Sequence, residues 1–472
     1  MIIINRHDML TRNTGPLLLK LSWPVMTGNV IYSLLCLVET YFVSLLGAVP
    51  LAVTTLTIPA QIFITAIASA AGVGLTSYIA RILGEGREKE AVNAAWHGII
   101  LAVIMGLLMW WLGTAYLDDM LLLSGCSKET FALSKTYLTI ILSGSVFTFI
   151  AIILANIMQG AGDTLWPMLT GLAGLAVNVA LDPLLIFGYG LVPAQGLSGV
   201  AIATVLGNSC AAALTIGLLI HRHPSLVRVR QFFIPRLSII MAILKVGVPA
   251  LVMEIAALLV MVFMNRVLVS YGSAAIAVLG IFLRIRSLVY MPVFGLNQGI
   301  MPVAGFAYGG ALPDRVKETM IKACALAFFL IAVPWAVIQW DSAWIMHFFS
   351  HNPQLTTLGE DCLRWSTLVL PVMGPIIVLT AILQAVDRGL EAMWLSLFRQ
   401  IVTFLPLVIF LPPWLGLKGV WLAFALSELL AALLGCFFFK LLWKQLSPPP
   451  RPRLLVLSPG YSAGRIWAWL RW

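Results

Sequence analysis

Two acidic side chains stand inside long apolar stretches of this sequence. Asp182 belongs to a stretch that begins near Leu165, and Glu39 belongs to the first apolar stretch of the chain. At about 1.5 Å per helical residue, Asp182 lies about 25 Å into its stretch, and Glu39 lies at a similar depth. Asn178 precedes Asp182 by one turn and shares its helical face. Because a carboxylate in hydrocarbon is costly, such acids usually mark the path of an ion or a substrate.

Two acids at one depth suit a site that couples transport to an ion. Paired carboxyl groups can bind and release protons, and a sodium ion would use the same oxygen atoms. Our first hypothesis is therefore a coupling site at Glu39 and Asp182. The alternative is that a buried carboxyl group only ties helices together.

Composition places most of the chain in a lipid bilayer. Of its 472 residues, 61% are hydrophobic and 10% are charged, and the mean hydropathy is +0.99. A soluble domain of this length does not have that balance. The formal net charge is +10, but the basic residues stand beside apolar stretches, where they signal topology. We therefore expect no nucleic-acid partner.

The apolar stretches predict twelve membrane-spanning helices. Each is long enough to cross a bilayer, which takes about 20 residues. The first is expected to be retained, because no small-residue cleavage site follows a short apolar core. The predicted spans are 17–45, 52–80, 92–113, 132–158, 165–188, 196–221, 241–269, 275–306, 316–340, 357–384, 391–414 and 417–443.

The two halves of the chain are repeats of each other. Pro24 corresponds to Pro249 and Gly84 to Gly309, each at a shift of 225 residues. Six helices per repeat is an even number, so both halves insert in the same direction and are related by an axis along the membrane normal. This is a transporter architecture, with the site between or within the halves.

Four regions follow from the repeat and from the charges. They are an N-terminal six-helix lobe (1–221), a basic linker (222–240), a C-terminal six-helix lobe (241–445) and a Pro-rich tail expected to be disordered (446–472). Lysine and arginine gather in the even-numbered connections, which predicts that both termini are cytoplasmic. We expect a multi-pass protein of the inner or plasma membrane, and a monomer because the two lobes already supply the pseudo-symmetry.

The sequence lacks the common nucleotide-binding and catalytic motifs. The sequence has no G-x-x-x-x-G-K-[ST] phosphate loop, so this chain does not itself use ATP. It also has no H-E-x-x-H, C-x-x-C or G-x-S-x-G motif, and we expect neither an enzyme nor a cofactor apart from a coupling ion. Cys126 and Cys362 fall in polar connections and could pair, although two free thiols are the simpler expectation.

Three motifs, in this order and spacing, resemble the multidrug and toxic compound extrusion (MATE) family. They are Asn156-x-x-Gln159-Gly-Ala-Gly-Asp-Thr, Asn178-x-x-x-Asp182-Pro183 and Gly196-x-x-Gly199-Val-Ala-x-Ala-Thr204. The resemblance implies two six-helix lobes that form a V and work by alternating access. It also implies export of hydrophobic, often cationic organic compounds in exchange for protons or sodium ions.

Two other functions stay open at this stage. A flippase for lipid-linked precursors or polysaccharides belongs to the same superfamily, but it would be expected to carry a more cationic cavity and extra helices. A membrane-embedded receptor or channel would show no dependence of substrate flux on pH or sodium. The repeat and the intramembrane acids favour the antiporter.

The resemblance also assigns roles to individual residues. The coupling site would comprise Glu39, Asp182, Asn178, Thr204 and Asn156, with Glu39 in place of the aspartate that the family usually has. A second cation or substrate site would include Glu254 and Arg284. The acid that accompanies this glutamate in some members of the family is missing here, so Glu254 would contact either a cation or one of the arginines, Arg284 or Arg286.

Further residues are expected from their chemistry alone. Methionine and aromatic side chains suit an adaptable cavity, although most such residues pack or face lipid. The candidates for the cavity are Tyr32, Met158, Met253, Met261, Tyr290 and Met291. In the turn Gln159–Thr164, Asp163 is expected to cap the following helix.

Overall fold

The computed structural model describes residues 6–123, 128–190, 193–224, 234–349 and 352–447. Throughout these residues the ordered elements are helices, and none is a β-strand. Ten helices are long and apolar enough to cross a membrane, and two bent pairs raise the number to twelve if each pair is one span. The prediction of an all-α protein with twelve spans is therefore confirmed for the described part of the chain.

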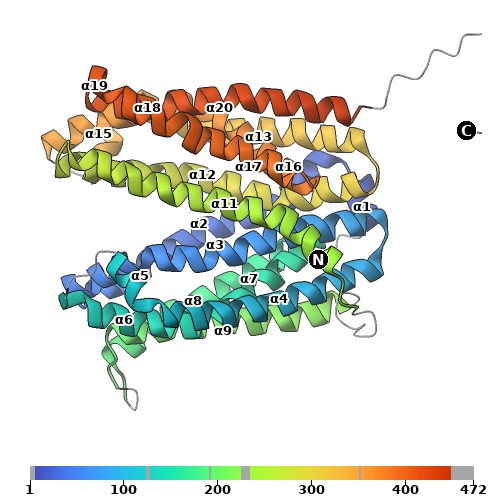
Figure 1. The fold of residues 1–472 in the computed structure, drawn as a ribbon, viewed down its shortest axis with the longest axis horizontal. Helices are drawn as coiled ribbons and strands as arrows, with labels where there is room; N and C mark the ends of the chain where they lie inside the picture. Colours follow the sequence, from blue (N-terminus) through green and yellow to red (C-terminus); the bar gives the residue numbers. More distant parts are fainter. Residues whose placement is uncertain (1–5, 124–127, 191–192, 225–233, 350–351, 448–472) are drawn as a thin grey trace, which may run out of the picture.

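The helices form two groups, which Figure 1 shows as separate layers coloured blue to green and yellow-green to red. The first lobe comprises α1 (Arg6–Thr11), α2 (Thr14–Ser44), α3 (Ala48–Glu85), α4 (Glu88–Ala115), α5 (Leu117–Leu123), α6 (Lys128–Ser143), α7 (Ser145–Gly160), α8 (Leu165–Phe187) and α9 (Leu197–Arg222). The second lobe comprises α11 (Leu237–Val269), α12 (Ser273–Gly309), α13 (Pro313–Trp340), α14 (Ser342–Phe349), α15 (Pro353–Ser366), η2 (Leu370–Val372), α16 (Met373–Ala385), α17 (Gly389–Leu397), the π-helix η3 (Phe398–Phe404), α18 (Leu405–Phe410), α19 (Pro412–Leu415) and α20 (Leu417–Gln445).

Three sequence predictions fall on residues outside the described ranges. Residues 225–233 of the basic linker and nearly all of the Pro-rich tail are among them. Cys126 is another, so the expectation that Cys126 and Cys362 are free thiols, with a disulfide between them as the alternative, stays a prediction. The boundaries of the four regions likewise remain predictions.

The repeat is visible in the bends of two helices. The fourth span bends by 46° between α6 and α7, and the tenth bends by 48° between α15 and the segment formed by η2 and α16. The second part of each span begins at equivalent positions, Ser145 and Leu370, which are 225 residues apart. The two halves of the sequence therefore fold into the same six-helix unit.

Glycines set the contact between the lobes. Gly84 on α3 packs against the carbonyl oxygen of Phe306 on α12, and Gly309 on α12 packs against the carbonyl oxygen of Arg81 on α3. Phe306 is the repeat equivalent of Arg81, so the two contacts are related by the pseudo-twofold axis. A side chain at either glycine would overlap with the backbone of the other lobe, because small residues are what lets membrane helices approach this closely.

Polar contacts hold the lobes together at the same end. Asp387, in the corner between α16 and α17, forms an ion pair with Arg81 of the first lobe at 3.1 Å and accepts a hydrogen bond from Lys245 of α11 at 2.7 Å. The Ser77 hydroxyl group on α3 donates to the carbonyl oxygen of Gln384 at 2.6 Å. We call this region, residues 77–90, 305–316 and 384–389 with the helix α1, the joined end.

The helix α1 contacts both lobes at the joined end. Arg6 donates to the carbonyl oxygen of Gly84 in the first lobe at 2.8 Å, and Arg315 of the second lobe donates to the carbonyl oxygen of Met9 at 2.9 Å. Figure 1 shows the two groups of helices meeting near α1 and standing further apart at the opposite end, where α5 and α15 lie. This is the V shape that the resemblance to the MATE family implies.

Replacing Asp387 by asparagine should weaken the joined end. Asp387 has a φ of 69°, a left-handed conformation that asparagine also tolerates, so the substitution removes the charge with little change in backbone strain. Loss of the charged partner of Arg81 and Lys245 should destabilise the joined state by about 1–3 kcal/mol. Spin labels at Glu88 and Leu390, in a cysteine-free background, should report longer distances between the lobes. Asp314→Asn is the control, because Asp314 is exposed and pairs only within α13; an equal response in both variants contradicts the prediction.

The turn between α7 and α8 is built as its sequence predicts. Gly162 has a φ of 88°, a conformation that favours glycine. The Asp163 carboxylate accepts from the backbone N–H of Trp166 at 3.3 Å and so caps α8. Its other oxygen lies 3.3 Å from His223 and 3.6 Å from Arg222, at the end of α9. The turn therefore fixes where α8 begins, and with it the depth of Asp182.

Candidate functional site

Asp182 is the least satisfied acid in the first lobe. It lies on α8 with 0% of its surface exposed. Neither of its carboxylate oxygens has a hydrogen-bond partner among the described residues. Burying such a group without partners costs free energy, and buried polar groups in proteins are nearly always paired. The arrangement therefore leaves the carboxyl group free to take a proton or a cation.

A second acid and a tyrosine surround Asp182. Glu39 on α2 is half-buried, and it lies close enough to Asp182 for the two carboxyl groups to interact electrostatically. Tyr137 on α6 is buried and lies within electrostatic reach of both acids. No basic residue forms an ion pair with either acid in the part of the chain that the structure describes. The structure thus brings together the two acids that the sequence singled out.

Asn178 lies on the same face of α8 as Asp182 and contacts a hydroxyl group of α9. Asn178 donates to the Thr204 hydroxyl group at 3.0 Å, and that hydroxyl group donates to the carbonyl oxygen of Val200 at 2.9 Å. The side-chain oxygen of Asn178 is buried without a partner. The free groups on this face are therefore oxygen acceptors, which suit a proton or a hard cation such as sodium.

Asn156 does not belong to this group. It lies on α7 near the turn to α8, and Asp182 lies near the far end of α8, so the two are separated by about 20 Å along the helix axes. Its side-chain oxygen accepts from Thr76 at 3.0 Å, and its amide group donates to the carbonyl oxygen of Ile152 at 2.8 Å. Asn156 therefore ties α7 to α3, and the structure corrects the expectation that it joins the coupling site.

The second lobe contains two cavities that share part of their walls. The first has a volume of about 370 Å³ and includes Met253 and Glu254, together with α3 residues of the other lobe. The second has a volume of about 340 Å³ and includes Met261 and Tyr290. Five residues line both cavities: Ala257, Phe294, Ile377, Arg399 and Gln400.

The remaining candidates lie elsewhere. Met158 is fully buried in the core of the first lobe, where it packs rather than lines a cavity. Met291 accepts through its sulfur atom from Ser33 of α2 at 2.8 Å, so it belongs to the contact between the lobes. Tyr32 is exposed on α2 and lies within electrostatic reach of Glu39.

Arg284 and Glu254 are not partners. Arg284 is exposed and lines neither cavity, whereas Arg286, two residues later, lines the second. Glu254 is exposed within the first cavity and forms no ion pair with any described residue. The expectation that Arg284 contributes to a site at Glu254 is therefore corrected: the helical phase of α12 turns Arg286 inward instead.

Sequence reasoning missed two charged residues of the second lobe. Glu428 lies on α20 with 3% of its surface exposed, and Arg399 lies on the π-helix η3. Both line the second cavity. Glu428 carries the same signal as Asp182, an acid inside an apolar span. Arg399 carries a comparable signal, because it stands inside the predicted span 391–414.

Comparisons with known proteins agree with this architecture. The MatE family model matches residues 24–184 and again residues 249–409, so the two matches are offset by the same 225 residues as the repeat. The FAD transporter of Shewanella oneidensis is 26% identical over 92% of this chain and 96% of its own length. The multidrug export protein MepA of Staphylococcus aureus is 26% identical over 91% of this chain and 94% of its own. A structure of a multidrug resistance MATE family transporter in its outward-facing conformation superposes with a TM-score of 0.86, at 26% identity, over 93% of this chain and 98% of that one.

Proposed function

Because this chain belongs to the MATE family of membrane transporters, we propose that it exports small organic compounds in exchange for protons or sodium ions. The observation that carries the proposal is Asp182, a fully buried acid with two unpartnered oxygens that interacts with Glu39. An ion bound there would neutralise the acids, and it would be bound with different affinity in different arrangements of the lobes. That difference in affinity is what couples ion and substrate.

The names of the relatives support the substrate class. MepA is a multidrug export protein, and the Shewanella protein is an FAD transporter. Both kinds of cargo are small organic compounds, and this is the class that we extend to the present chain. The chain needs no further cofactor for such transport, and the two lobes suffice for it as a monomer.

The positions of the basic residues support an orientation. Arg81, Arg87 and Arg315 all lie at the joined end. Since cytoplasmic connections are rich in lysine and arginine, we assign the joined end and both termini to the cytoplasmic side. The state described here is then closed towards the cytoplasm, as the outward-facing relative would be.

A transport assay tests the proposal. The purified protein is reconstituted into liposomes loaded with ethidium or a fluoroquinolone, and a pH gradient or a sodium gradient is imposed. We expect substrate flux that follows one of the two gradients and stops when that gradient is dissipated. Flux that ignores both gradients contradicts ion coupling and favours the flippase or the channel instead.

A further inference from the structure

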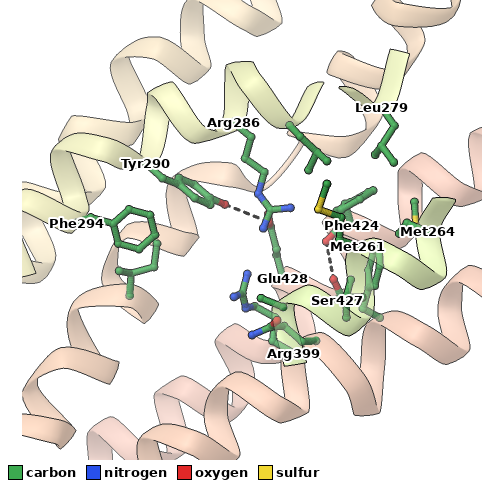
Figure 2. A pocket seen from close by; sticks show the side chains of 16 residues that line it. Met261, Met264, Leu279, Arg286, Tyr290, Phe294, Arg399, Phe424, Ser427 and Glu428 are labelled. Atoms are coloured by element: carbon green, nitrogen blue, oxygen red, sulfur yellow. Dashed lines mark hydrogen bonds between the residues drawn. The ribbon is translucent and has the colours of Figure 1, made fainter. Parts of the chain in front are cut away.

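The cavity inside the second lobe holds more positive than negative charge. Arg286 of α12 and Arg399 of η3 both line it, and Glu428 of α20 is the single acid among its lining residues. Figure 2 shows the three side chains converging from these different helices. One carboxylate for two guanidinium groups leaves the cluster with a net positive charge. Such groups are costly within a membrane and are usually functional.

The acid does not neutralise either arginine by direct contact. Neither guanidinium group lies within 4.0 Å of a carboxylate oxygen in the part of the chain described. Glu428 accepts instead from the hydroxyl group of Tyr290 at 3.3 Å, and its second oxygen is buried without a partner. The guanidinium group of Arg286 lies over the rings of Tyr290 and Phe424, at 5.2 Å and 5.6 Å. The aromatic rings thus hold Arg286 in place, and neither arginine is paired with a described carboxylate.

The rest of the wall suits a flat apolar body. Aromatic, methionine and aliphatic side chains line most of the cavity, and Phe294, Phe404, Phe424 and Met261 are among them. The volume of about 340 Å³ accommodates a one- or two-ring compound, and the adjoining cavity of about 370 Å³ extends the space towards α3. Arg399 stands in the wall that the two cavities share.

We propose that this cavity binds organic anions, with Arg286 and Arg399 holding a carboxylate or phosphate group and the aromatic wall contacting the apolar body. Guanidinium groups match these anions in shape and bind them through charge-assisted hydrogen bonds. The inference rests on the proposed transport function, and it adds a substrate class that the sequence, with its intramembrane carboxylates, did not suggest. Glu428 limits the affinity for anions, because it repels them.

Four naphthalene compounds with different head groups test the preference directly. They are 2-naphthoate, 2-naphthyl phosphate, (2-naphthylmethyl)trimethylammonium and 2-naphthylmethanol. Binding to the purified full chain in detergent is measured by isothermal titration calorimetry, without any ion gradient. We expect at least one of the anions to bind about tenfold or more tightly than the ammonium compound and the alcohol, because complementary charge favours it. The two anions show whether a carboxylate or a phosphate is preferred.

Substitutions of the charged residues test whether the anions bind in this cavity. Arg286→Met and Arg399→Met should lower anion affinity to that of the alcohol, while Glu428→Gln should raise it several-fold. Arg284→Met is the matched control, since Arg284 stands on the same helix but lines neither cavity. If an arginine variant fails to fold, the gain expected from Glu428→Gln still tests the proposal.

Two results overturn the inference. One is equal or tighter binding of the ammonium compound by the parent protein. The other is anion binding that survives both arginine substitutions, in which case the charged cluster only ties α12, η3 and α20 together. The titration measures binding without any gradient. A negative titration therefore does not contradict ion coupling at Asp182, and a negative transport assay does not change what the titration says about anion binding.

Discussion

Asp182→Asn will abolish gradient-driven transport while the protein still folds. Asparagine has nearly the same size and occupies the same place on α8, but it cannot take up a proton or neutralise a cation. Coupling between two sites typically changes affinity by about 5- to 150-fold, so its loss should reduce gradient-driven flux by roughly 100-fold, to the level of leakage.

The stability of the variant separates loss of coupling from loss of structure. Both oxygens of Asp182 lack partners, so the substitution breaks no hydrogen bond with a described residue. Removing a buried, unpartnered carboxyl group is neutral or stabilising, and the thermal unfolding midpoint should not fall. Asp118→Asn serves as the control, because Asp118 is exposed and pairs with Lys135 on the surface of the same lobe. Parent-like flux along the gradient in Asp182→Asn would remove the basis of the coupling proposal.

Gly84→Val and Gly309→Val will each keep the joined end from closing. Each glycine packs directly against a carbonyl group of the opposite lobe, where backbone atoms cannot rotate away as a side chain would. Overpacking of this kind costs about 1–3 kcal/mol, which lowers the population of the joined state by about 5- to 150-fold. A transporter that cannot reach this state cannot complete its cycle, so flux should fall in proportion.

The pseudo-twofold axis makes this prediction sharper. Since the two contacts are equivalent, the two variants should shift the distance between the lobes by similar amounts, as measured with the spin labels at Glu88 and Leu390. Gly280→Val is the control on α12, because a side chain at Gly280 would meet nothing within 4 Å. Joined-state distances and flux that match the parent in both variants would show that the glycine contacts do not limit closure.

Much of the architecture could be predicted because its signals are local or periodic. Spans long enough to cross a bilayer, the turn at Gly162 and the cap at Asp163 depend on neighbouring residues alone. The repeat could be found because the same residues recur at a constant shift, and the bends at Ser145 and Leu370 obey that shift. Asp182 and Glu39 stood out because acids are rare in apolar spans.

The wrong predictions of site residues have a common cause: the sequence does not show which side of each helix faces the interior of the protein. A membrane helix is apolar both towards lipid and towards its neighbours, so hydrophobic periodicity does not reveal which side faces inward. For this reason the sequence predicts Arg284 at a cation or substrate site, whereas the structure shows Arg286 lining the cavity. For the same reason it predicts Met158 at the cavity, whereas the structure packs Met158 in the core.

The sequence by itself determined that this chain is a membrane protein of two repeated six-helix units with two acids at matching depth. Composition, length and recurrence carry that information without any long-range contact. Only the tertiary structure decided that Asp182 lacks partners and that Arg286, Arg399 and Glu428 meet in one cavity. The cavity joins Arg286 to Arg399 and Glu428, which stand more than 100 residues later in the sequence, and it includes a π-helical turn at Arg399; local residue patterns specify neither.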